Sequence, residues 1–261
     1  MRIVIKVGTS TLAHATGRLN IQRMERLCKV LSDLKNAGYE IILVSSGAIG
    51  MGVGKLNLPG RPADMPGKQA AAAVGQCELM HIYDKMFLEY GINVAQILLT
   101  RENIVDTEQR QNIHNTFTEL TKIGVVPIIN ENDSVATAEL KHIENFGDND
   151  TLSAVVARMC EADLLVIFSD IDGLYTANPH THPDAKLIPL VERITPEVLA
   201  LADGAGSALG TGGMSTKLRA AQMVTAEGAD MVIANGSHPE LLYDIADGRP
   251  AGTRFAGRKE G

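Results

Sequence analysis

Two lysines stand where an ammonium group would need an anionic partner. Lys6 lies inside the first run of apolar residues, Ile3 to Val7, and burying its charge unpaired would be costly. Lys217 follows a glycine-rich segment at the start of a predicted helix, where backbone N–H groups and an ammonium can face one anion. Both lysines therefore favour phosphate binding. The alternatives are that Lys6 extends out of an edge strand, and that the glycines only form a cap and turn.

The glycines add weaker evidence of the same kind. Gly8 and Gly47 follow predicted strands, and a residue without Cβ lets phosphate oxygens approach the backbone closely. The segment 210–217 reads G-T-G-G-M-S-T-K and lacks the G-K-[ST] ending of a Walker loop, and no G-x-G-x-x-G occurs. A nucleotide site here would thus be of another type, and a nicotinamide dehydrogenase is disfavoured.

Acidic and amide side chains gather in two short segments, 130–133 (N-E-N-D) and 148–150 (D-N-D). The first follows an apolar strand and the second begins a predicted helix. Carboxylates suit an ammonium group or a magnesium ion, and amides can bind a carboxylate and an amine together. The mixture favours an amino-acid substrate over the alternative, a solvated loop.

Composition excludes several classes. The chain has 261 residues, 24 Lys and Arg against 31 Asp and Glu, and a net charge of -7. With no basic block, nucleic-acid binding is not expected. No stretch of 18 apolar residues or signal peptide is found, so no membrane association is expected and the chain is predicted to be cytoplasmic. The three distant cysteines are predicted to be reduced, buried thiols.

Strand-like apolar runs alternate with helical periodicity along the chain. The pattern predicts an α/β fold with an open, mostly parallel sheet and helices on both faces, forming one domain over 1–261. Ligands of such sheets bind beyond the carboxyl ends of the strands. Strands are expected at 3–7, 40–44, 93–98, 125–129, 164–168 and 231–234, and helices at 21–34, 68–90, 113–122, 151–160, 215–227 and 239–246.

Four segments together resemble the amino acid kinase family over essentially the full length. They are V-I-K-V-G-T-S at 4–10, S-S-G-A-I at 45–49, I-N-E-N-D-S-V-A-T at 129–137 with F-G-D-N-D at 146–150, and G-T-G-G-M-S-T-K at 210–217. The resemblance implies a three-layer α/β/α sandwich. It is strongest to the branch that uses ATP to phosphorylate the γ-carboxylate of L-glutamate to L-glutamyl 5-phosphate, the first step of proline biosynthesis.

The resemblance also implies roles for residues. Lys6 and Lys217 would hold the ATP phosphates, and Asp150 would orient the two lysines. The part before about residue 165 would bind the amino acid, and the rest the nucleotide. Magnesium would be held by the ATP phosphates, with no protein side chain as a metal ligand. Glutamate would be bound by Ser46, Gly47, Asp133 and Asn149, and ATP by Lys6, Gly8, Ser169, Asp170, Thr211, Gly212, Gly213, Met214, Ser215, Thr216 and Lys217.

Partners follow from the same resemblance. It implies a homo-oligomer, inhibition by proline, and hand-off of the product to a glutamyl phosphate reductase. The PUA domain found in many members of this branch is not expected in this chain. The stretch between Ala138 and Phe146 is longer than the family pattern, and Ser45 stands where threonine is common. The alternatives are an N-acetylglutamate kinase, an aspartokinase, or a non-catalytic amino-acid or nucleotide sensor.

Overall fold

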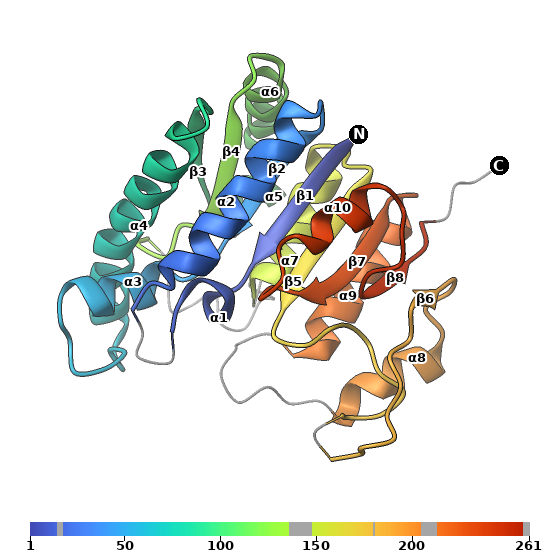
Figure 1. Ribbon diagram of the computed structural model, residues 1–261. Coiled ribbons are helices and arrows are strands. Elements are labelled where there is room, and N and C mark those ends of the chain that lie inside the picture. Colours follow the sequence, from blue (N-terminus) through green and yellow to red (C-terminus); the bar gives the residue numbers. More distant parts are fainter. Residues whose placement is uncertain (15–17, 136–147, 180, 205–212, 258–261) are drawn as a thin grey trace.

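The computed structural model describes residues 1–14, 18–135, 148–179, 181–204 and 213–257. In this part of the chain, one sheet of eight strands has the order β3-β4-β2-β1-β5-β7-β8-β6, and only β8 runs antiparallel to its neighbour β7 (Figure 1). The prediction of an open, mostly parallel sheet is confirmed. The strands are β1 (Arg2–Val7), β2 (Glu40–Ser45), β3 (Val94–Leu99), β4 (Val126–Glu131), β5 (Leu164–Ser169), β6 (Leu190–Val191), β7 (Asp230–Asn235) and β8 (Thr253–Phe255).

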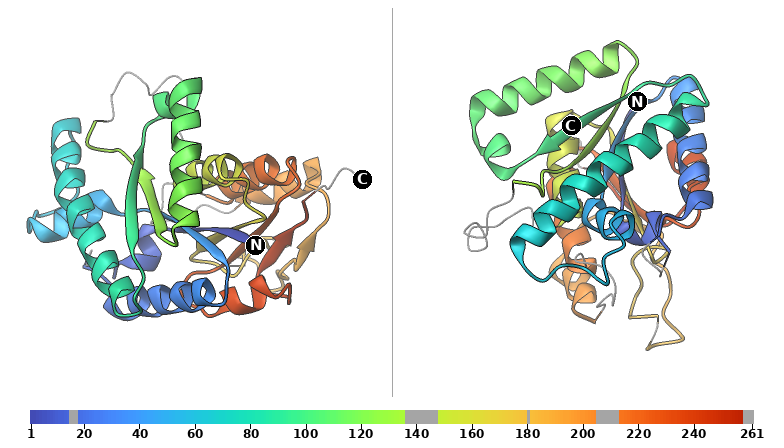
Figure 2. Two further views of the ribbon diagram at one scale, coloured as in Figure 1. Left: turned by 90° about the horizontal axis from the view of Figure 1, so that it is seen from above. Right: turned by 90° about the vertical axis from the view of Figure 1, so that its left-hand side faces the viewer.

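Helices cover both faces of the sheet, as the view from above shows (Figure 2). On one face lie α2 (Ile21–Asn36), α4 (Met65–Leu88) and α10 (Leu241–Ala246), and on the other α6 (Thr107–Lys122), α7 (Asn149–Met159) and α9 (Met214–Thr225). Shorter helices are α1 (Thr9–Leu12), α3 (Ala48–Lys55), α5 (Arg101–Val105), α8 (Pro196–Ala200) and the 3-10 turn Leu201–Gly204. The described residues contain no helix long and apolar enough to cross a membrane.

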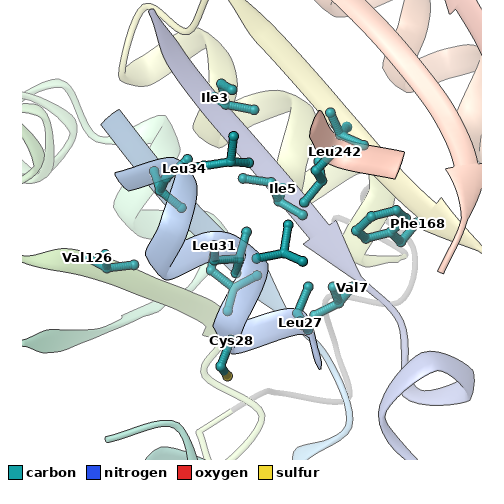
Figure 3. Close-up of a cluster of buried hydrophobic side chains, with 14 of the residues drawn as sticks. Ile3, Ile5, Val7, Leu27, Cys28, Leu31, Leu34, Val126, Phe168 and Leu242 are labelled. Carbon is teal, nitrogen blue, oxygen red and sulfur yellow. The ribbon is translucent and has the colours of Figure 1, made fainter. Parts of the chain in front are cut away.

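The central strand β1 determines which way Lys6 points. Successive side chains of a strand face opposite sides of the sheet. Ile3, Ile5 and Val7 pack under α2, as Figure 3 shows, whereas Val4 belongs to the core on the side of α7 and α9. Lys6 has the parity of Val4 and lies near the carboxyl end of β1. It therefore reaches the edge of the sheet where α7 and α9 begin.

The helix α3 was not predicted, because its sequence A-I-G-M-G-V-G-K contains three glycines, which disfavour a helix. Tertiary packing overrides that preference. A Cβ added to Gly52 would lie 1.8 Å from the carbonyl oxygen of Ala71, and one added to Gly75 equally close to that of Ala48. The glycines therefore let α3 and α4 pack backbone against backbone, directly after Gly47.

The predicted burial of the cysteines is correct for two of the three. Cys28 and Cys160 are buried, and all three are free thiols. Cys77 is exposed, because it lies on the solvent side of α4. Its predicted burial was wrong.

Candidate active site

Two lysines from distant parts of the chain contact one carboxylate. The Lys6 Nζ atom lies 2.7 Å from Oδ1 of Asp150, and the Lys217 Nζ atom lies 3.1 Å from Oδ2. Lys217 donates a hydrogen bond to Asp150, and Lys6 forms a close ion pair with the other carboxylate oxygen. Strand β1, helix α7 and helix α9 thus meet at one point beyond the carboxyl end of β1.

Burial makes this cluster electrostatically strong. Asp150 is 1% exposed, Lys6 9% and Lys217 6%. Burial by itself raises the pKa of Asp150, but the two ammonium groups and the Thr216 hydroxyl outweigh it and hold that pKa below its ordinary value. Asp150 is therefore ionised at neutral pH, and it fixes both lysines in place.

The first turn of α9 supplies a further donor. The Thr216 hydroxyl donates to Oδ2 of Asp150 over 2.8 Å. An ammonium group has three N–H donors, and a carboxylate accepts about four hydrogen bonds. Two ammonium groups face this single carboxylate, so the three groups together carry a net positive charge, which suits the binding of a second, external anion. The sequence placed Thr216 at the nucleotide but not at Asp150, because spacing carries no signal for a contact across 66 residues.

A polar pair lies beside the lysine cluster. Asn149 Nδ2 donates to the Ser46 hydroxyl over 2.5 Å, which ties the end of β2 to the start of α7. Asn149 Oδ1 is buried and has no hydrogen-bond partner among the described residues. Asp148 caps α7 by accepting a hydrogen bond from the Thr151 N–H at 2.8 Å, as expected for Asp at a helix start. This cap holds Asn149 and Asp150 in the first helical turn.

Three carboxylates at the ends of β4 and α7 have raised pKa values. Burial, together with the nearby charges of Asp133 and Asp148, raises the pKa of Glu131 to about 7. Burial also raises the pKa values of Asp133 and Asp148. The positive charge of Arg61 partly opposes the rise at Asp133. Mutual repulsion and partial desolvation would both be relieved by a bound cation such as an amino group. Arg61 was not predicted at this place, since 59–62 shows only a loop signal.

The pKa of Glu131 predicts a pH-dependent stability. A carboxyl group whose pKa is higher in the folded state destabilises the fold once it is ionised. Stability should therefore fall as pH rises from about 4.5 through about 7 and then level off. Glu131→Gln should remove this part of the slope in urea unfolding at about pH 5, 6, 7 and 8. Glu25→Gln, at an exposed position in α2, is the control, and an unchanged slope in Glu131→Gln would refute the assignment.

The backbone at two strand ends is open to a ligand. Gly47 has a φ of +99°, the left-handed region that favours glycine. Gly8 lies beside Lys6, since a Cβ there would lie 3.5 Å from the Lys6 Nζ. At the end of β5, Ser169 is buried and its hydroxyl donates to the exposed Asp170 over 3.1 Å. Each of these residues lies at the carboxyl edge of the sheet.

The other predicted residues are only partly placed. Thr211 and Gly212, like the stretch between Ala138 and Phe146, lie outside the described residues. Gly213 is the N-cap residue of α9, and Ser215 is exposed on this helix. The Met214 side chain packs in the apolar core, so only the backbone of Met214 could contact a ligand. In the part of the chain that is described, no three His, Cys, Asp or Glu side chains are grouped to hold a metal ion.

Comparison with known proteins identifies the family. The sequence pattern of the amino acid kinase family matches residues 1–235. The chain belongs to the amino acid kinase family. Within this family it is 53% identical to the glutamate 5-kinase of Clostridium perfringens over 99% of this chain and 96% of that protein. It is 54% identical to the glutamate 5-kinase of Listeria welshimeri, covering 99% and 94%.

Solved structures of two other kinases share the fold. A carbamate kinase from Giardia lamblia bound to AMP-PNP superimposes with a TM-score of 0.69 at 19% identity, covering 98% of both chains. A UMP kinase from Bacillus anthracis gives 0.66 at 15% identity, covering 99% of this chain and 96% of that one. Both likenesses confirm the three-layer architecture of the amino acid kinase family.

Proposed function

We propose that the chain phosphorylates the γ-carboxylate of L-glutamate with ATP, the activity of a glutamate 5-kinase, and thereby begins proline biosynthesis. The observation that carries the proposal is the contact of two buried lysines with Asp150. Beside it, Asn149, the preceding residue of α7, is hydrogen-bonded to Ser46. The first group suits a phosphoryl group, and the second an amino acid. The full-length identity to glutamate 5-kinases supports the choice of glutamate.

The reaction needs little from the protein beyond alignment and charge. A γ-carboxylate is ionised at neutral pH, so its oxygen can attack the γ-phosphorus without a general base. The new O–P bond forms as the bond to the β-phosphate oxygen breaks, and ADP leaves with the electron pair. Lys6 and Lys217 would stabilise the negative charge that spreads over the phosphoryl oxygens. Magnesium would enter as part of the MgATP substrate, held by its phosphates.

The site divides into two halves along the strand order. The acceptor half would consist of Ser46, Gly47, Asp133 and Asn149, in which the buried Asn149 Oδ1 and the carboxylates near Asp133 would receive the α-ammonium of glutamate. The nucleotide half would consist of Gly8, Ser169, Asp170, the segment 211–217 and both lysines. Asp150 would orient the lysines between them. One domain over 1–261 would hold both halves on a single sheet.

The wider setting is proposed on the same basis. The chain would act in the cytoplasm as a homo-oligomer, and proline, the end product, would inhibit it. Its acyl phosphate hydrolyses readily in water, so a glutamyl phosphate reductase would take the product directly.

Trapping the product with hydroxylamine tests the proposed reaction. The protein is incubated with MgATP and hydroxylamine together with L-glutamate, N-acetylglutamate or L-aspartate. We expect hydroxamate formation with glutamate in large excess over the other two acids. Preferred use of N-acetylglutamate or aspartate would indicate another kinase of the family, and absence of hydroxamate with all three would reject catalysis.

Asp133→Ala should weaken glutamate binding selectively. Losing one charged partner of the substrate ammonium typically costs about 1.5–3 kcal/mol, so the KM for glutamate should rise roughly 10- to 100-fold. The KM for ATP should change by less than about twofold, because Asp133 belongs to the acceptor half. Initial rates over a grid of both substrates measure the two values. Equal losses for both substrates, with a lower melting temperature, would instead indicate misfolding.

A further inference from the structure

Helix α4 carries two buried polar side chains that no step above uses. The buried face of α4 is formed mainly by small and apolar residues, among them Ala72, Leu79 and Phe87. Gln76 and Tyr83 lie on the same face, at helical spacings from Leu79, and both are buried. Buried polar groups need partners, so the question is what these two bind.

Both side chains bind strand ends that lead into the acceptor half. Tyr83 shares a hydrogen bond of 2.9 Å with the hydroxyl of Ser45, the last residue of β2 and the neighbour of Ser46. Gln76 Oε1 accepts from Asn130 Nδ2 at 2.9 Å. Asn130 in turn accepts from the backbone N–H of Glu131 at 2.9 Å through its side-chain oxygen. Two separate hydrogen bonds thus connect α4 to the residues around Ser46 and Asp133.

Close backbone packing makes this connection rigid. Gly75, next to Gln76, lies against the carbonyl oxygen of Ala48, so near that a Cβ would stand 1.8 Å from it. Ala48 follows Gly47, and α3 lies along α4 in Figure 1. A displacement of α4 would therefore move the turn after β2 as well. The residues of the nucleotide half come from β1, β5 and α9. In the sheet, β1 separates β5 from β2 and β4, the two strands that α4 contacts through these hydrogen bonds.

We propose that Gln76 and Tyr83 are positioning residues for the acceptor substrate, through which α4 holds the ends of β2 and β4 in the geometry that binds glutamate. The proposal rests on the proposed function for the identity of the substrate. In this proposal, α4 affects the binding of glutamate and leaves the binding of ATP unchanged.

Steady-state kinetics of Tyr83→Phe and Gln76→Met test the proposal. Each variant removes one buried hydrogen bond and keeps the approximate volume. We expect the KM for glutamate to rise about fivefold or more in each, with kcat and the KM for ATP within about twofold. The matched control is Thr225→Ala, which removes a buried hydroxyl bonded to Ala221 in the last turn of α9 and should leave both KM values unchanged.

Two results would overturn the proposal: an unchanged KM for glutamate in both variants, or equal rises in both KM values. Hydrogen exchange of the ligand-free protein supplies a test that needs no substrate. Residues 45–49 should exchange faster in Tyr83→Phe and residues 130–133 faster in Gln76→Met, with neither faster in Thr225→Ala. If the wild-type protein made no hydroxamate from glutamate, the proposed function would fail, and unchanged exchange in these segments would separately reject the role of α4.

Discussion

Replacing Lys217 with alanine is expected to lower kcat about 10²-fold or more, the scale for losing one preorganised donor to a developing charge. Lys6→Ala should have an effect of the same order. The variants should still fold, because in each of them Asp150 keeps the other lysine as its partner. Rates of hydroxamate formation at saturating substrates measure the change.

Arg219→Ala is the matched control for Lys217→Ala. Arg219 is exposed on the same helix, two residues further along, so its loss removes a cation without touching the cluster. Near-normal turnover in Lys217→Ala, or an equal loss in Arg219→Ala, would show that the buried ammonium group has no special role in catalysis.

Asp150→Asn is expected to abolish activity and to destabilise the protein strongly. Removing one partner of a buried ion pair typically costs about 3–5 kcal/mol, and here two ammonium groups lose the same carboxylate. The free energy of unfolding in urea measures the loss. Because the pKa of Asp150 is lowered in the fold, the wild-type protein should also lose this contribution as pH falls through and below the usual range of a carboxyl group.

A second substitution separates the two effects of Asp150→Asn. Adding Lys217→Met to that variant removes one of the two like charges that faced the carboxylate. We expect part of the lost stability to return, while activity stays absent. If the double variant were less stable than Asp150→Asn alone, repulsion between the two lysines would not explain why Asp150→Asn destabilises the protein.

Much of the fold could be predicted because it depends on local pattern. The apolar runs of β1, β2 and β5 and the periodicity of α2 are visible in the sequence, and their order implies a parallel sheet. Helix α6 begins at Thr107, earlier than the expected 113, since its first turns are polar and carry no periodic signal. The strands β6 and β8 were missed because two or three residues form no pattern, and α3 because its glycines serve packing.

The site could be predicted in part for a similar reason. The apolar run around Lys6, the strand ends and the glycines indicated Lys6, Gly8, Gly47 and Lys217. The family resemblance gave Asp150 its role beside the two lysines. The contacts that join distant segments, such as Thr216 to Asp150 and Tyr83 to Ser45, depend on how the layers pack. The roles of the predicted site residues stay predictions until the variants are measured.

The two proposed halves of the site meet in consecutive residues of one helix. Asn149 binds Ser46, and Asp150 binds the lysines, so a single turn of α7 would join the amino-acid half to the nucleotide half. Each residue turns a helix by about 100°. One residue inserted between Asn149 and Asp150 would rotate one of them by this angle relative to the other and could therefore keep at most one of the two contacts, whereas an insertion at the far end of α7 would leave both intact.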